Sequence, residues 1–281
     1  MSRRTLTEQL YDQTPAGILV PSGSTTDIRS FARTSVTAAK LDGLELLQLF
    51  RRQGLNPNRS TSLIRLIEST ARLSDALLMA KDHEKSYADL FSALQVSRIV
   101  DAINTVTNDA PLPRILKELL DGDIDLLARS QSKAKDTLWE LELLRMMRAN
   151  GVKAVLDEPD LLLAGMADEI GVACKKLYSE ANFSKVISVA VRQIRRSLKL
   201  GLVAVNIDDL LPANTILSAD SQEVASQMMN IRIGDFMARQ ERYLRHYLEP
   251  GRAIAILVSC AALADLKHNV NRPGFRGGHL V

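Results

Sequence analysis

The sequence predicts an α/β protein that carries an all-helical module in its N-terminal half. Leu41, Leu44 and Leu47 open a series of helical spacings, and no strand pattern interrupts the series before about residue 130. After residue 150, short apolar strands alternate with long helices, an order typical of a mixed sheet with helices on its faces. The chain has only 14 glycines and 9 prolines among 281 residues, and 4% aromatic residues, which favours helices around an aliphatic core.

The N-terminal half divides into an arm and a helical module. Residues 1–40 are rich in Ser, Thr, Gly and Pro, and we expect an extended arm there. Residues 41–130 follow helical spacing, with Asn56-Pro57-Asn58 separating two of the expected helices. The module matches no clear helix-turn-helix pattern, so its expected roles are to bind a protein partner, to dimerise or to read DNA.

Residues 131–281 form the predicted α/β domain. A helix over about 132–149 ends at Asn150-Gly151, a typical C-terminal capping pair. Asp220 and Glu223 resemble a capping box at the start of a later helix. The remaining elements follow in chain order as strands over 152–156, 160–163 and 170–175, a helix over 183–199, a strand over 201–207, a helix over 220–248 and a strand over 253–259.

The charge of the chain is close to balanced overall but segregated locally. The 36 Lys and Arg exceed the 33 Asp and Glu by only +3, which excludes a histone-like polyanion binder. Residues 132–169 hold eight acids against five bases, whereas residues 170–200 hold seven bases against one acid, a local excess of +6. We therefore expect an acidic cluster beside a basic helix, and a polyanionic partner.

Several classes of protein are excluded by what the sequence lacks. It shows no signal peptide and no apolar run long enough for a transmembrane helix, so we expect no membrane partner and a cytoplasmic protein. Cys174 and Cys260 are too few for a disulfide framework. The four histidines are scattered, and no Cys/His cluster predicts a zinc site.

The chemically informative residues lie between the helix near residue 140 and the basic helix. Glu142 falls within the apolar arc of its helix, where a carboxylate is costly unless a partner pairs with it. Asp160 follows Pro159, which marks a bend or a strand edge. Lys175 shares a strand face with Gly171 and Ala173, whose small side chains leave room for a ligand. The alternatives are a Glu142 that reaches solvent from the edge of the arc and a Lys175 at a solvated strand end.

These residues together resemble the P-D-x(n)-(D/E)-x-K nuclease superfamily, which includes type II restriction endonucleases, Holliday-junction resolvases and RecB-like nucleases. The resemblance covers about residues 132–260 and implies a restriction-endonuclease-like fold with an α-β-β-β-α-β core. The matching positions are the helical Glu142, Pro159-Asp160, Ala173-Cys174-Lys175, and Gln193 in the following helix.

The resemblance implies a site for Mg²⁺ or Mn²⁺ in which Asp160 is a metal ligand and Lys175 positions water or phosphate. Gln193 is implied to orient a neighbouring group or to contact phosphate. The sequence departs from the family at Ala173, where an acid is expected two residues before the lysine. Glu142 is predicted to replace that missing ligand, with Glu158 and Glu140 as further candidates.

The function that these implications favour is metal-dependent hydrolysis of DNA phosphodiester bonds, by an endonuclease rather than an exonuclease. Cutting both strands of a duplex favours a homodimer, and prokaryotic defence or DNA repair are the settings typical of such nucleases. One alternative is a catalytically inactive relative that binds nucleic acid without cutting it. Another is an α/β domain that serves protein assembly.

Overall fold

The structure, a computed structural model of the whole chain, has an α/β fold. It describes residues 11–13, 19–21, 31–33, 35–78, 87–164, 169–197, 200–212, 215–248, 253–266 and 277–280. Seven α-helices lie within these described residues: α1 (Val36–Arg52), α2 (Ser62–Leu78), α3 (Tyr87–Asn104), α4 (Leu112–Glu118), α5 (Lys133–Ala149), α6 (Phe183–Ser197) and α7 (Gln222–Tyr247).

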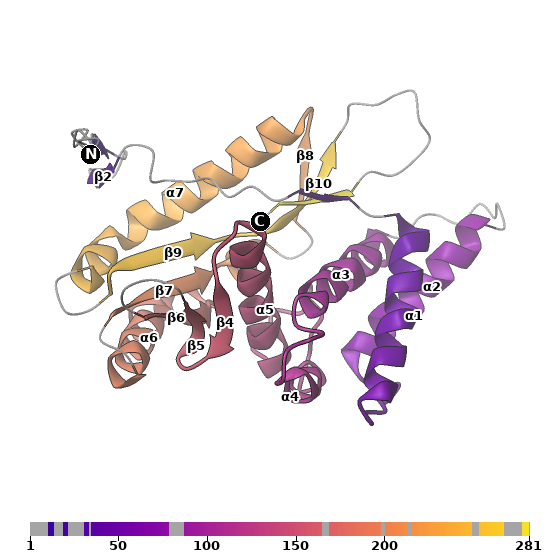
Figure 1. The fold of residues 1–281 in the computed structure, drawn as a ribbon. Coiled ribbons are helices and arrows are strands. Elements are labelled where there is room, and N and C mark those ends of the chain that lie inside the picture. The colour runs from indigo at the N-terminus through magenta and orange to yellow at the C-terminus, as the bar shows by residue number, and fades with distance from the viewer. Residues whose placement is uncertain are drawn as a thin grey trace, which may run out of the picture.

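A five-stranded mixed sheet forms the centre of the α/β part (Figure 1). Its strand order is β4 (Ala154–Asp157), β5 (Asp160–Leu163), β6 (Ile170–Lys176), β7 (Leu200–Asn206) and β9 (Ala255–Ser259). The first three strands form an antiparallel meander, whereas β7 runs parallel to β6 and β9 runs parallel to β7. The observed order of α5, three strands, α6 and a parallel strand is the one that the sequence predicts.

A second sheet joins segments from both ends of the chain. Its strand order is β3 (Phe31–Arg33), β11 (Gly277–Leu280), β10 (Ala262–Leu266) and β8 (Ile216–Ala219). A separate hairpin pairs β1 (Tyr11–Gln13) with β2 (Leu19–Pro21). The sequence pattern predicted none of these six strands. The expected N-terminal arm lies largely outside the described residues, but β3 belongs to this sheet and α1 begins within the range expected to be extended.

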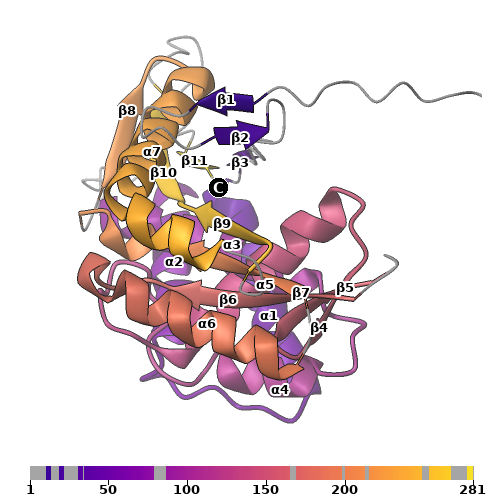
Figure 2. The same ribbon diagram turned by 90° about the vertical axis from the view of Figure 1, so that its left-hand side faces the viewer.

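Helices cover both faces of the five-stranded sheet, and the alternation along β6 divides its side chains between two apolar clusters. Val172 and Cys174 belong to a cluster that continues through α5 into the N-terminal helices. Ala173 belongs to the cluster formed with α6 and α7 on the opposite face. Figure 2 shows α6 lying across β6 and β7 on that face. The alternation predicted for this strand is therefore confirmed.

Local capping explains where several helices begin and end. The Ser132 side chain accepts a hydrogen bond from Lys135 N at 3.2 Å and so caps α5. Asn150 caps the other end, and Gly151 has a positive φ of 77°, as the Asn-Gly pair predicts. At α7 the capping side chain is Ser221 rather than the expected Asp220. In the described part of the chain, no helix combines the length and hydropathy that a membrane crossing needs.

Candidate active site

Three of the four predicted site residues meet at the Asp160 carboxylate. Its Oδ2 accepts hydrogen bonds from Cys174 N at 2.7 Å and from Lys175 Nζ at 3.0 Å. Its Oδ1 accepts a hydrogen bond from Gln193 Nε2 at 3.1 Å. The Gln193 amide also donates to the Pro159 carbonyl oxygen. Residues from β5, β6 and α6 therefore converge on one carboxylate.

The fold explains this convergence. The β4–β5 hairpin turns at Glu158-Pro159, so that Asp160 is the first residue of β5. The neighbouring strand β6 ends at Lys176, and the alternation of a strand turns Lys175 to the face that α6 covers. The α6 helix packs on that face through its apolar stripe, which leaves Gln193 on the flank nearest Asp160. The flanking position predicted for Gln193 is what allows this hydrogen bond.

A second carboxylate, that of Glu140, faces the same site from α5. Glu140, Asp160 and Lys175 line one open hollow of about 420 Å³, together with Lys185 and Val189 of α6. Burial and the negative charge of Asp160 raise the pKa of Glu140 to about 7, although Lys133 and Lys175 act to lower it. Glu140 is therefore the acid that the structure places beside Asp160.

Glu142 occupies a different site from the one predicted. Its side chain is buried, as its position in the apolar arc suggested, with a relative exposure of only 2% for the residue. Both of its carboxylate oxygens accept hydrogen bonds from Arg98 of α3, which lies 44 residues earlier in the chain. The prediction that Glu142 joins Asp160 as a metal ligand is therefore corrected, because Arg98 neutralises Glu142 on the opposite face of the sheet. Glu158 also fails to join the hollow at Asp160, and instead lines a neighbouring hollow with Gln193.

Ala173 occupies the position two residues before Lys175, where the resemblance leads one to expect an acid. Its side chain is fully buried in the apolar cluster beneath α6. A carboxylate at this position would be removed from water without the partners that such burial requires. The second acid of the site therefore comes from α5 and not from β6.

A buried ionic network that no sequence pattern predicted lies at the carboxyl ends of the parallel strands. Lys176, the residue after the site lysine, points to the opposite face and contacts Asp209 Oδ2 at 2.7 Å and Asn206 Oδ1 at 2.6 Å. Asp208 contacts Arg98 Nη2 at 3.0 Å. Burial acts to raise the pKa of Asp208, but the charges of Lys176 and Arg98 hold it below its usual value. No local pattern marks this network, since its members come from α3, β6, β7 and the segment after β7.

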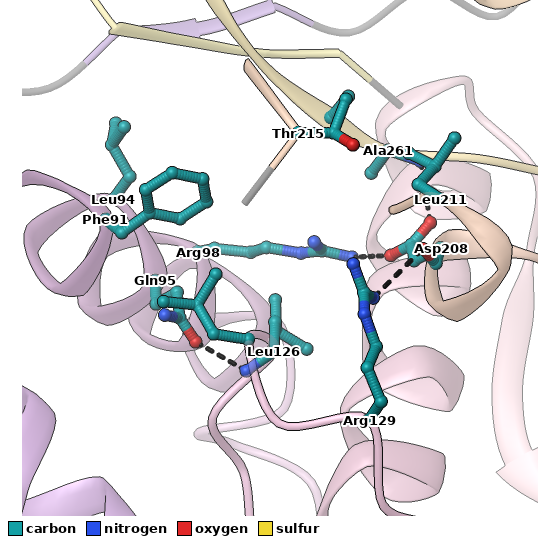
Figure 3. A pocket seen from close by; sticks show the side chains of 12 residues that line it. Phe91, Leu94, Gln95, Arg98, Leu126, Arg129, Asp208, Leu211, Thr215 and Ala261 are labelled. Carbon is teal, nitrogen blue, oxygen red and sulfur yellow. Dashed lines mark hydrogen bonds and ion pairs between the residues drawn. The ribbon is translucent and has the colours of Figure 1, made fainter. Parts of the chain in front are cut away.

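Arg98 and Arg129 connect this network to the helical module (Figure 3). The Arg129 side chain donates from Nη1 to the Asp208 carbonyl oxygen at 3.2 Å and from Nη2 to the Pro212 carbonyl oxygen at 3.0 Å. Beside them lies a small cavity of about 60 Å³, with apolar walls that include Phe91 and Leu126. This volume has room for roughly four to six water molecules. The network therefore holds the two parts of the chain together and offers little space for a ligand.

Three acids, Asp136, Glu140 and Asp160, line the hollow, and the last two fit a hard divalent cation. Mg²⁺ prefers oxygen ligands and is usually held by one or two carboxylates with several waters. Asp160 and Glu140 provide two carboxylates near enough for one to raise the pKa of the other, and a bound cation would relieve this repulsion. The described residues contain no group of three or more His, Cys, Asp or Glu side chains able to hold a metal. A site built from this pair therefore depends on water to complete the coordination of the ion.

No family model, curated protein or solved structure matches this chain. The residues around Asp160 therefore indicate what the chain can do chemically. They combine two carboxylates with a primary amine and a carboxamide at the edge of a basic helix. This set can hold a cation, orient a water molecule and neutralise a phosphate.

Proposed function

We propose that the chain is a divalent-metal-dependent nuclease of the P-D-x(n)-(D/E)-x-K type, with a restriction-endonuclease-like α/β domain, that hydrolyses DNA phosphodiester bonds. The observation that carries the proposal is the convergence of Asp160, Lys175 and Gln193 at one point, beside a hollow that Glu140 also lines. The resemblance singles out Asp160, Lys175 and Gln193 in the sequence. The contacts of their side chains bring these residues together in the fold. Endonucleolytic cutting by a homodimer is the form of the activity that we propose.

In this proposal Asp160 and Glu140 hold Mg²⁺ or Mn²⁺, so that Glu140 takes the role first assigned to Glu142. A divalent ion bound there supplies Lewis acidity and lowers the pKa of a bound water. Lys175 carries its ammonium group 3.0 Å from Asp160 and is placed to orient the attacking water or to neutralise the scissile phosphate. Gln193 fixes the orientation of the Asp160 carboxylate through Oδ1 and so acts as a positioning residue.

The proposal is tested by incubating the purified protein with supercoiled and linear DNA in the presence of Mg²⁺, Mn²⁺ or EDTA. We expect nicked or linear products only with a metal, and a loss of at least a hundredfold in Asp160→Asn and Lys175→Ala. Glu140→Gln should lose activity to a similar extent, because it removes the second carboxylate. Glu68→Gln, a change of an exposed residue on α2, is the matched control and should cut normally.

The second candidate function is nucleic-acid binding without cutting, and Ala173 is the observation that favours it. An active site of this type normally takes its second acid from that position, which is buried and apolar here. Cleavage that depends on Glu140 would exclude this candidate. If no metal supports cutting of any DNA form while the protein still binds DNA, the nuclease proposal fails and the binding function replaces it.

A further inference from the structure

Three basic side chains and one valine form a row on the outward face of α6. Lys185, Val189, Arg192 and Arg196 are spaced by four, three and four residues, so they lie on one side of the helix. All four are exposed, whereas the opposite side of α6 is buried against the sheet. We call this row the α6 stripe. Figure 2 shows α6 on the near side of β6 and β7.

Among the described residues, no acidic side chain pairs with the positive charges of the stripe, which are those of Lys185, Arg192 and Arg196. Arg192 Nε makes only a long contact of 3.4 Å with the Ser188 carbonyl oxygen of its own helix. Some exposed bases elsewhere do have acidic partners, as Arg239 has with Glu180 at 2.8 Å. The stripe is therefore free to meet negative charge from outside the protein.

Two hollows adjoin along the stripe and lead to the proposed active site. One is the hollow of about 420 Å³ that Lys185 and Val189 line together with Asp160. The other, of about 440 Å³, is lined by Glu158 and, on α6, by Val189, Arg192, Gln193, Arg196 and Ser197. Val189 belongs to both, and the hydrogen bond between Gln193 and Asp160 connects their inner walls. The stripe therefore borders a recess that passes Asp160.

We propose that the α6 stripe binds the phosphodiester backbone of one strand of a nucleic-acid duplex and so places that strand beside Asp160. This inference rests on the proposed function, which explains why a strand would be placed beside Asp160. The binding itself needs no cleavage. Arg196 lies eleven positions after Lys185, which corresponds to a rise of about 16 Å along the helix axis. A strand of B-form DNA advances about 3.4 Å per nucleotide along its axis, so the stripe spans roughly five nucleotides.

The lining of the recess indicates contact with the backbone rather than with the bases. None of the described residues that line the two hollows is aromatic, so they provide no surface on which an unpaired base could stack. The Gln193 carboxamide, which could otherwise read a base edge, already donates to Pro159 and Asp160. We therefore expect binding that favours duplex over single strands and is independent of sequence.

The test is a fluorescence-anisotropy titration of labelled duplexes in EDTA, at several salt concentrations, with the wild-type protein and a triple variant Lys185→Ala, Arg192→Ala, Arg196→Ala. Each lost phosphate contact reduces the magnitude of the slope of log K against log[salt] by about 0.9. The slope of the triple variant should therefore be smaller in magnitude by about 2.7 than that of the wild-type protein. The loss should be the same for unrelated duplex sequences. Parallel titrations with DNA and RNA duplexes distinguish the two sources of phosphodiester.

The matched control is the triple variant Arg51→Ala, Arg65→Ala, Arg72→Ala, which removes three exposed bases from α1 and α2 at the far end of the molecule (Figure 1). Its salt slope should equal that of the wild-type protein. Equal losses in the two triple variants, an unchanged slope in the α6 variant, or no binding of any duplex at low salt would each overturn the proposal. Because EDTA suppresses cleavage, binding that depends on the stripe supports the inference even where the nuclease test fails.

Discussion

Burial of its side chain, and then the negative charge of Asp160, raise the pKa of Glu140 to about 7. A carboxyl group whose pKa is raised from 4.5 to about 7 on folding favours the folded state below pH 4.5 and loses this advantage as pH rises through 7. The cost of ionising it in the fold is on the order of 3 kcal/mol. Glu140→Gln should therefore be more stable than wild type at pH 8.5, with the two converging toward pH 5, as measured by urea unfolding.

Added Mg²⁺ provides the control for that prediction. If Asp160 and Glu140 hold the ion, Mg²⁺ should stabilise the wild-type protein at pH 8.5 and have little effect on Glu140→Gln. A difference in unfolding free energy between variant and wild type that stays constant across the pH range would show that Glu140 does not titrate as described.

Glu140 and Glu142 show how far helical spacing alone can predict which carboxylate of a helix faces a site. Helical spacing separated the two correctly, since Glu142 lies within the buried arc of α5 and Glu140 on its flank. It could not supply their partners, because Arg98 reaches Glu142 from a helix 44 residues earlier. The resemblance singled out Asp160, Lys175 and Gln193 in the sequence. In the structure one hairpin, one strand alternation and one helix position bring them together.

At the scale of elements, the contact between α6 and the sheet sets the position of both Gln193 and the α6 stripe. Gly201 of β7 lies directly beneath Ile194 of α6 and opposite Gly171 of β6. A Cβ atom at position 201 would clash with Ile194 Cγ2 and lie 2.7 Å from the Gly171 carbonyl oxygen. Gly201→Ala should destabilise the protein by about 1–3 kcal/mol, measured by urea unfolding, because backbone must move to admit the methyl group.

Gly234→Ala on α7 is the matched control for this substitution. No atom lies within 4 Å of the Cβ that it adds, and alanine is the better helix former by roughly 0.5–1 kcal/mol. It should therefore stabilise the protein slightly. Equal effects of the two glycine substitutions would contradict the close packing of α6 on β7.

The elements that the sequence predicted well are the ones with a strong local pattern. The strand expected over 160–163 matches β5 residue for residue, and those expected over 170–175 and 201–207 match β6 and β7 within one residue at each end. The apolar stretch after residue 253 was less informative, because only Cys260 and Ala261 separate β9 from β10. The chain passes there from one sheet to the other, and a continuous apolar run gives no sign of the change.

At the scale of the whole molecule, the helical module and the α/β part share one buried interior. The apolar cluster around α5 includes Phe50 of α1, Ile99 of α3 and Leu161 of β5. The buried contact of Arg98 with Glu142 and Asp208 crosses the same boundary. Because unfolding of either part would expose this shared surface, we expect a single cooperative unfolding transition.

Arg98→Met should lower the midpoint of that whole transition. It leaves the buried carboxylates of Glu142 and Asp208 without their arginine, at a cost of about 3–5 kcal/mol. Glu142→Met should cost less, because Arg98 keeps its contact with Asp208 at 3.0 Å. The double variant should be more stable than Arg98→Met alone, since it removes one of the two stranded charges. Two separate transitions in urea, with Arg98→Met moving only one of them, would show instead that the helical module folds independently of the sheet.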